Sequence, residues 1–578
     1  MSRWLIPVAA LFFLLSVAAG GARRPHLNVA RYPAMPPSSS SDSPVKDGET
    51  LPPYDKIYTF DQFIDHNNPS LGTFKQRYCF SYEYYEKDGP IILSTREKLS
   101  LVNGYSGYVT NLTMNGVVAQ TNKGAAVMIE HRFFGQSNPF GNLSEESFRV
   151  HILEQAIDDL VYFAKTAVLP MPEGGHVSAN NTPWLLFGGS YSGALTSWTM
   201  TARPDVFWAG YASSAVVEAI SYFWVFEAQI RPNRRHMPKN CSADVQRVIH
   251  HMDLTFIEGS QAEKDALKAQ FGMSNVTHLD DVASALRIPL NYWQDLQPTT
   301  GPGSSFAMFC DALEVKNGVS APAAGWGLEY ALEAFGNYMK QFIAQNCVGT
   351  DVECLLTYFN TCLGTHDKDL AFWHDITLDN PTRSWLWFWS TVGYWQDGAP
   401  DAWPSIVTRL VTPAYDEVSR SDYFFPETFP TETSAKPKTS ETNFKYQGWD
   451  TVAPRLFFAN GERDPWRDAT VSSDFTFRKS TPENPIAVSD AFHCSDMIIG
   501  HNIDSTVAGV QELAVKQFIE WVKEYKTHSA STAPASVTSA TGSKSTGEDG
   551  MKPPLPNAWA RPPPFKGLNQ EHSQHLLG

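Results

Sequence analysis

A serine in a short glycine-rich turn has the clearest chemical use in this sequence. Ser190 ends the run WLLFGGS, in which an apolar, strand-like stretch breaks into two glycines before helix-compatible sequence resumes. Such a strand-to-helix turn strains the serine backbone and exposes its hydroxyl, and only small neighbours fit there. The pattern predicts a nucleophile for covalent hydrolysis, although the glycine expected two places later is Ser192, with Gly193 one position further.

Two later segments supply an acid and a base. The run PRLFFANGERD is an apolar strand followed by a polar loop that ends on Asp464, and PIAVSDAFH repeats the pattern and ends on His493. A serine hydroxyl is too weak a nucleophile alone, so His493 is expected to accept the proton of Ser190 and return it to the leaving group. Asp464 is expected to fix the imidazole tautomer and stabilise the imidazolium.

The chain order serine, acid, histidine, each just after a strand, is that of α/β-hydrolases and not of trypsin-like or subtilisin-like enzymes. The backbone N–H of Tyr191 is expected to donate to the oxyanion, because it opens the helix after the serine. A second donor is expected in the loop after the strand 90–93, near Thr95, Arg96 and Glu97, but that loop lacks the expected glycines.

Other residues offer alternatives to these three. Asp468 and His501 are the nearest substitutes for the acid and the base, and both lie farther past their strands. Cys494, next to His493, suggests a cysteine protease, but it has no turn of its own like that around Ser190. A lipase or esterase would use the same triad, and a catalytically inactive hydrolase kept as a binding protein is a further alternative.

Several segments resemble the family of prolyl carboxypeptidase and dipeptidyl peptidase II. They are residues 59–78, 130–137 (EHRFFGQS), 153–160 (LEQAIDDL), the serine turn, and 460–466 (NGERDPW). The resemblance covers about Thr59 to Tyr525, and residues 385–400 look most like secreted fungal members described as prolyl endopeptidases.

The resemblance implies a serine peptidase that cleaves on the carboxyl side of proline, with Ser190, Asp464 and His493 at the catalytic positions. Trp466 would form the aromatic wall of a slot for the proline ring, and core packing is its alternative role. Internal cleavage, carboxypeptidase action and removal of dipeptides all remain open. Family members commonly have Gly-Glu where residues 95–97 stand, and many have a cysteine near Ser390, so one cysteine of this chain would lack its partner.

Composition sets limits on the partners of this chain. Its 578 residues carry 45 Lys and Arg against 61 Asp and Glu, a formal charge of −16, which disfavours nucleic acid and anionic membranes. Hydrophobic residues at 42% and aromatic residues at 13% describe a globular enzyme. The family resemblance implies that its substrates are proline-containing peptides or proteins. We expect no cofactor and no metal site, because neither paired Cys-x-x-Cys motifs nor His-Glu-x-x-His occur.

The N-terminus has the features of a secretory signal, with Arg3 before an apolar stretch and small residues up to Ala22. No stretch is long enough to anchor the chain in a membrane, so we expect secretion, with a vacuolar or lysosomal compartment as the alternative. Seven cysteines then allow up to three disulfides, whose pairing stays open. Glycosylation is expected at five sequons: Asn111, Asn142, Asn180, Asn240 and Asn275.

The predicted organisation is an α/β-hydrolase core interrupted by a large, mainly helical cap, because strand–helix alternation stops from about Val217 to Asp450. The expected segments are a signal peptide (1–22), a flexible leader (23–55), the first core part (56–216), the cap (217–450), the second core part (451–527) and a disordered Ser, Thr and Pro-rich tail (528–578). The sequence leaves the oligomeric state open.

Overall fold

The computed structural model describes residues 43–96, 105–223, 236–347, 362–393, 404–417, 422–428 and 438–532. Contacts divide the chain into Met1–His528 and Ser529–Gly578, and the first unit contains the sheet and the helices that pack on it. The expected signal peptide, Glu97, Cys354 and nearly all of the expected tail lie outside the described residues.

A sheet of eight strands forms the centre of the fold, in the order β12-β11-β8-β7-β5-β6-β4-β3. β4 pairs antiparallel with β3 and β6, whereas all other neighbours pair parallel. The strands are β3 (Tyr58–Phe63), β4 (Thr73–Ser81), β5 (Ile91–Arg96), β6 (Ala125–Glu130), β7 (Trp184–Gly189), β8 (Ala209–Ser213), β11 (Leu456–Gly461) and β12 (Ile486–Ser489).

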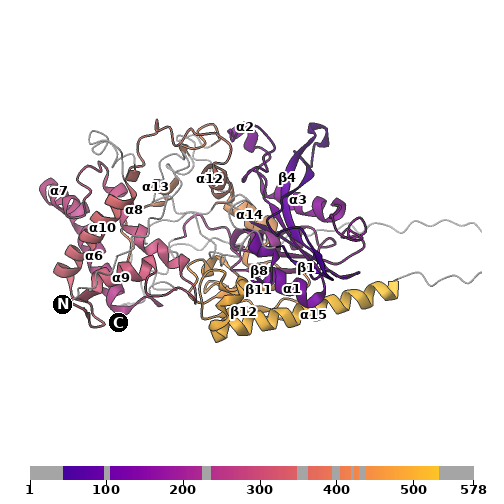
Figure 1. Cartoon of the computed structure of the whole chain (residues 1–578). Helices are drawn as coiled ribbons and strands as arrows, with labels where there is room; N and C mark the ends of the chain where they lie inside the picture. Colours follow the sequence, from indigo (N-terminus) through magenta and orange to yellow (C-terminus); the bar gives the residue numbers. More distant parts are fainter. Residues whose placement is uncertain are drawn as a thin grey trace, which may run out of the picture. The chain divides into compact units, whose positions relative to one another are not determined.

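Helices cover both faces of this sheet (Figure 1). Alternate residues of a strand point to opposite faces, and in β7 Leu186 joins one apolar cluster while Leu185 and Phe187 join another. The first cluster contains residues of α3 (Leu153–Thr166) and α4 (Ser190–Ala202), and the second contains residues of α1 (Met114–Asn122) and α15 (Ser505–Thr532). The three layers and the mixed sheet confirm the predicted α/β-hydrolase fold.

The described part of the region between β8 and β11 is mainly helical, with the short strands β9 (Val315–Lys316) and β10 (Val319–Ser320) between two of its helices. Its helices α6, α7, α9 and α10 contact one another and share an apolar cluster of their own (Figure 1). The bounds are α6 (Lys239–Glu258), α7 (Gln261–Gln270), α8 (Leu279–Asn291), η3 (Tyr292–Asp295), α9 (Ser305–Glu314), α10 (Leu328–Asn346), α12 (Pro381–Val392), α13 (Pro413–Glu417) and α14 (Thr439–Tyr446). Contacts keep this region in one unit with the sheet, and the bounds 217–450 of the helical cap stay a prediction.

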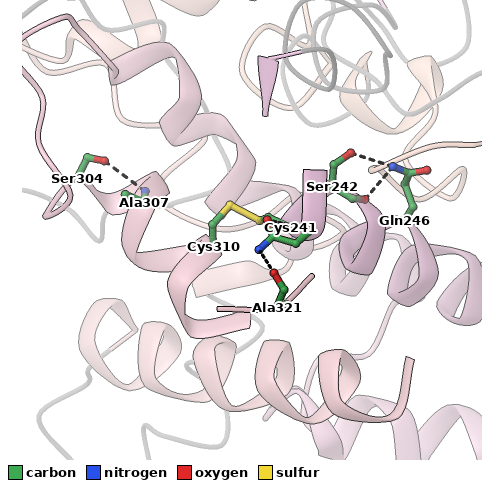
Figure 2. Close-up of a disulfide and its surroundings, with 8 residues drawn as sticks. Cys241, Ser242, Gln246, Ser304, Ala307, Cys310 and Ala321 are labelled. Carbon is green, nitrogen blue, oxygen red and sulfur yellow. Dashed lines mark hydrogen bonds between the residues drawn. A yellow bond between two sulfur atoms is a disulfide. The ribbon is translucent and has the colours of Figure 1, made fainter. Parts of the chain in front are cut away.

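Two disulfides lie in this helical region. Cys241 of α6 pairs with Cys310 of α9 (Figure 2). At the start of α9 the Ser304 side chain accepts a hydrogen bond from the Ala307 N–H and caps the helix (Figure 2). Cys347 pairs with Cys362. Cys79 and Cys494 are buried free thiols, so the described residues contain two of the three disulfides that the sequence allows.

The structure differs from the sequence predictions at three places. The helix after the serine turn begins at Ser190 itself, one residue before Tyr191, because the turn and the first helical residue coincide. Part of the expected flexible leader is ordered, since β1 (Val45–Lys46) pairs with β2 (Glu49–Thr50). The hairpin of β3 and β4 was not predicted as strands, because its edge-strand sequence has no continuous apolar run.

The remaining short elements are α2 (Glu145–Phe148), β9 (Val315–Lys316), β10 (Val319–Ser320), η1 (Pro69–Leu71), η2 (Tyr105–Val109), η5 (Gly448–Asp450), η6 (Arg467–Ala469), η7 (Ser495–Met497) and η8 (Ile499–Ile503). Among the described residues, no helix combines the length and apolar character that crossing a membrane requires.

Candidate active site

Ser190 is the first residue of α4 and follows β7 directly. Its φ of 55° lies in the left-handed region, which costs a residue other than glycine about 1–3 kcal/mol and is typical of functional turns. Glycine is required at position 188, because a Cβ there would lie 2.0 Å from the Ser192 carbonyl oxygen. At Gly193 a Cβ would lie 2.8 Å from the Ser213 carbonyl oxygen. The turn therefore has the strain and the close packing that the sequence predicted.

Asp464 and His493 form a buried pair just past the ends of β11 and β12. His493 Nδ1 lies 2.9 Å from each carboxylate oxygen of Asp464, and both side chains are fully buried. The Trp466 N–H also donates to Asp464 Oδ1 at 2.8 Å, which fixes the carboxylate. This arrangement favours the tautomer with its proton on Nδ1. His493 Nε2 is buried and has no hydrogen-bond partner among the described residues, so it can accept a proton.

The pKa of His493 reflects opposing effects. Burial alone would lower it, but the Asp464 carboxylate and the neighbouring Cys494 outweigh burial and raise the pKa of His493 well above its ordinary value. The pair thus favours the imidazolium, the form that appears when a base has taken a proton from a nucleophile.

Backbone contacts hold the loops of the acid and the base together. The Arg463 N–H donates to the Ala491 carbonyl oxygen at 2.8 Å, and the Glu462 N–H donates to Ser489 at 2.8 Å. Gly461 makes this approach feasible, because a Cβ there would lie 2.5 Å from the Ala491 oxygen. The relative placement of Asp464 and His493 therefore depends on Gly461, which lies in the segment 460–466 that carries the family resemblance.

The loop after His493 is anchored to the end of β8. The Cys494 N–H donates to Ser214 Oγ at 3.0 Å. The buried Asp496 accepts from Tyr211 at 2.5 Å and from Ser213 Oγ at 2.8 Å. Burial raises the pKa of Asp496. A buried carboxyl with two hydroxyl donors is a rigid anchor. Contacts with β8 therefore help to hold the loop that carries His493.

Two residues of the helical region also contact these loops, and the sequence reasoning missed both. The Trp293 indole N–H donates to the Arg463 carbonyl oxygen at 2.8 Å. Gln297 Nε2 donates to the His493 carbonyl oxygen at 2.9 Å, while its Oε1 accepts from Ser495 Oγ at 2.7 Å. No short motif marks either residue, because each lies at least 170 positions from its partner.

Residues 59–512 match the model of the family described as Serine carboxypeptidase S28. The chain belongs to this family. Membership makes it a serine peptidase, and its substrates are peptides. The mixed sheet and the strained Ser190 turn agree with a hydrolase of this class.

Relatives of this S28 peptidase cover most of its length. Serine protease vicPa of Bipolaris victoriae is 34% identical over 488 residues, 82% of this chain and 90% of that protein. A "Probable extracellular serine carboxypeptidase" of Arthroderma benhamiae is 28% identical and covers 73% of this chain and 59% of its own length. Lysosomal Pro-X carboxypeptidase of Homo sapiens is 24% identical, and the match covers 89% of this chain and 98% of the human protein.

The alternative residues of the S28 peptidase are engaged elsewhere. Asp468 Oδ1 accepts from Ser473 Oγ at 3.2 Å and from the Asp474 N–H at 2.8 Å. His501 Nδ1 lies 2.9 Å from the Ser495 carbonyl oxygen, and burial lowers the pKa of His501. Cys494 Sγ is buried 3.8 Å from a backbone oxygen of β8. His493 pairs with Asp464 and not with Asp468, while its contact with Cys494 helps to raise the pKa of His493.

Tyr191, Thr95 and the backbone of Arg96 are the described parts of the predicted oxyanion site. The structure places Thr95 and Arg96 within β5, paired with Ile129 and Glu130, and not in a loop after the strand as the sequence predicted. The Tyr191 N–H lies in the first turn of α4, at the positive end of the helix dipole. The Tyr191 hydroxyl lies 3.1 Å from His131 Nε2, which fixes the side chain. Thr95 is buried in β5 and donates to the Ile129 carbonyl oxygen at 3.2 Å. The remainder of the predicted second donor loop includes Glu97, outside the described residues.

Trp466 belongs to an aromatic cluster two residues from Asp464. Its ring stacks on Phe223 at 5.6 Å and meets the Trp389 ring edge-on at 6.0 Å. The indole N–H donates to Gln294 Oε1 at 3.3 Å, and the side chain is 3% exposed. Core packing therefore describes the contacts of Trp466 well, and a role in binding stays a prediction.

The five sequons differ in accessibility. Asn111, Asn142 and Asn180 are exposed, whereas Asn240 and Asn275 are half-buried. Asn240 Nδ2, the atom a glycan would occupy, donates to the Ala321 carbonyl oxygen at 3.4 Å. The exposed three are the more accessible sites for the predicted glycosylation.

Proposed function

We propose that this S28 peptidase is secreted and cleaves peptide bonds on the carboxyl side of proline through an acyl-enzyme, with Ser190, His493 and Asp464 as its triad. One observation carries the proposal: a fully buried imidazole, paired with a carboxylate at 2.9 Å, keeps its other nitrogen without a hydrogen-bond partner in the described part of the chain. The strained serine at the start of α4 supplies the complementary nucleophile.

In the proposed reaction Ser190 Oγ attacks the carbonyl carbon while His493 Nε2 takes the hydroxyl proton. The imidazolium is stabilised by Asp464, consistent with the raised pKa of His493. The oxyanion accepts from the Tyr191 N–H, aided by the positive end of the α4 dipole. His493 then protonates the leaving amine, and water, deprotonated by the same imidazole, releases the acid product and regenerates Ser190.

The proline preference rests on the family resemblance and on the aromatic cluster around Trp466. Among the relatives, the human protein is named a lysosomal Pro-X carboxypeptidase. Trp466 lies two residues from Asp464 and packs against Phe223 and Trp389, so its ring has a fixed orientation. A rigid aromatic wall suits the compact proline ring.

Secretion is supported by four features. The N-terminal signal pattern and the exposed sequons both belong to the secretory pathway. The disulfides Cys241–Cys310 and Cys347–Cys362 persist in an oxidising compartment. One relative is named an extracellular carboxypeptidase.

We propose that the helical region controls the access of substrate to the triad. The end of the bound peptide that this region blocks then determines the cleavage mode.

The test compares Ser190→Ala with the matched variant Ser192→Ala on proline peptides and on the same peptides with alanine in place of proline. We expect Ser190→Ala to stay folded and to lose about 10³-fold or more of kcat/KM, and to lose labelling by a fluorophosphonate. Ser192→Ala should keep both. Retained turnover in Ser190→Ala, or equal cleavage after proline and alanine, contradicts the proposal. Mass spectrometry of products from one long peptide identifies the cleavage mode.

A further inference from the structure

Two imidazoles and a carboxylate meet at the start of α8. His278 is the residue before that helix, Asp280 lies in its first turn, and His366 comes from the segment after the Cys347–Cys362 disulfide. One potential ligand atom from each residue lies within 4.8 Å of the other two. It is the one group of metal-ligating side chains of this kind among the described residues, and the proposed peptidase mechanism does not use it.

The three side chains contact one another at the start of α8. The rings of His278 and His366 stack at a centroid distance of 3.7 Å and an angle of 10°. His366 Nε2 lies 2.9 Å and 3.0 Å from the two oxygens of Asp280. The side chains of His366 and Asp280 are 36% and 28% exposed, so an ion can reach them from solvent.

The backbone that carries His366 is fixed by the neighbouring residues. Asp281 is fully buried, and its Oδ1 accepts from the Thr365 N–H at 3.0 Å, from Thr365 Oγ1 at 2.7 Å and from the Tyr415 hydroxyl at 2.8 Å. The disulfide at Cys362 holds the same segment four residues earlier. Thr365 therefore places the backbone of His366 beside Asp280, so ion binding requires rotation of side chains and no rearrangement of this segment.

We propose that His278, Asp280 and His366 bind a divalent transition-metal ion of the Zn²⁺ class. Two imidazole nitrogens with one carboxylate oxygen suit Zn²⁺, whereas Ca²⁺ and Mg²⁺ require oxygen ligands. Metal–ligand bonds of about 2.0–2.2 Å set donor separations near ~3.3 Å in a tetrahedral site. The ligand atoms lie within 4.8 Å of one another, and rotation of the two exposed imidazoles brings them to the shorter separation around a bound ion. Water completes the coordination.

The bound ion would join the start of α8 to the segment 362–366 and brace the helical region. This proposal departs from the sequence expectation of no metal site. His366 lies 86 residues from Asp280, so no short spacing motif could indicate the site.

The experiment titrates ZnCl₂ into the full chain, produced without a polyhistidine tag and stripped with a chelator, by isothermal calorimetry. We expect one saturable equivalent for the wild type, and at least about 10-fold weaker binding for His278→Ala, His366→Ala and the isosteric Asp280→Asn. MgCl₂ and CaCl₂ should not bind there. His176→Ala removes an exposed histidine elsewhere and should leave Zn²⁺ binding unchanged.

Peptidase activity and the thermal midpoint without metal show that each variant is folded. Zn²⁺ should raise the thermal midpoint of the wild type and of His176→Ala, and not that of Asp280→Asn. Absence of saturable binding in the wild type, or equal binding in the double variant His278→Ala/His366→Ala, overturns the proposal.

Discussion

Glu314 allows a quantitative test of the electrostatics of the helical region. It ends α9, its side chain is 3% exposed, and neither carboxylate oxygen has a hydrogen-bond partner in the described part of the chain. Burial and then the charge of Asp244 raise the pKa of Glu314 from 4.5 to about 7, against a lowering effect of Arg247. The folded protein therefore holds a proton here that the unfolded chain releases near its ordinary value.

The sign of the stability effect follows from this difference. Above about pH 4.5 the unfolded state loses the proton first, so stability falls as the pH rises and levels off above about 7. The interval between 4.5 and about 7 corresponds to at most about 3 kcal/mol, or on the order of 100-fold in the opening equilibrium of α9. Glu314→Gln removes the titration, so this loss should disappear.

Hydrogen exchange of α9 peptides at pH 5 and pH 8 measures the effect, because comparing wild type with Glu314→Gln at each pH cancels the intrinsic exchange rate. The protection ratio of variant to wild type should rise by on the order of 100-fold between the two pH values. Asp311→Asn, which changes an exposed acid on the same helix, should show no such rise. A ratio independent of pH for Glu314→Gln would refute the reasoning.

Two further predictions concern the acid and base loops. Asp464→Asn should lower kcat by about 10⁴-fold, and it should move the acid limb of the kcat/KM profile to lower pH, because the carboxylate that raises the pKa of His493 is gone; an unmoved limb contradicts the pairing. Gly461→Ala should lower kcat/KM at least about 10-fold, because its Cβ would push on the Ala491 carbonyl 2.5 Å away, whereas Gly500→Ala, with open space around it, should be neutral.

The core strands were predictable because buried parallel strands are continuous apolar runs. Those ending at Leu93, Phe187 and Ala459 were all indicated, and the structure extends each by two or three residues. The β3–β4 hairpin was not, since β3 has only six residues and its one buried side chain is the polar Gln62. Edge strands depend on their partner more than on their own pattern.

The pairing of Asp464 with His493 was predictable for a related reason. Both follow adjacent parallel strands, whose carboxyl ends share one edge of the sheet. The contacts of Trp293 and Gln297 with these loops were not, because they join segments at least 170 residues apart and involve backbone oxygens. A backbone acceptor leaves no trace in residue identity, so only the folded chain reveals such support.

The bond between Cys241 and Cys310 closes a ring of chain with a sequence separation of 69. Trp293 and Gln297 both lie within that ring. The side chains that donate hydrogen bonds to the loops of Asp464 and His493 therefore belong to a segment that a disulfide closes. Closing a ring of this size removes about 4 kcal/mol worth of freedom from the unfolded chain. Reduction of this disulfide thus removes a covalent constraint on the segment that supports the His493 loop. A thiol reagent should therefore alter proton transfer at the triad without touching it.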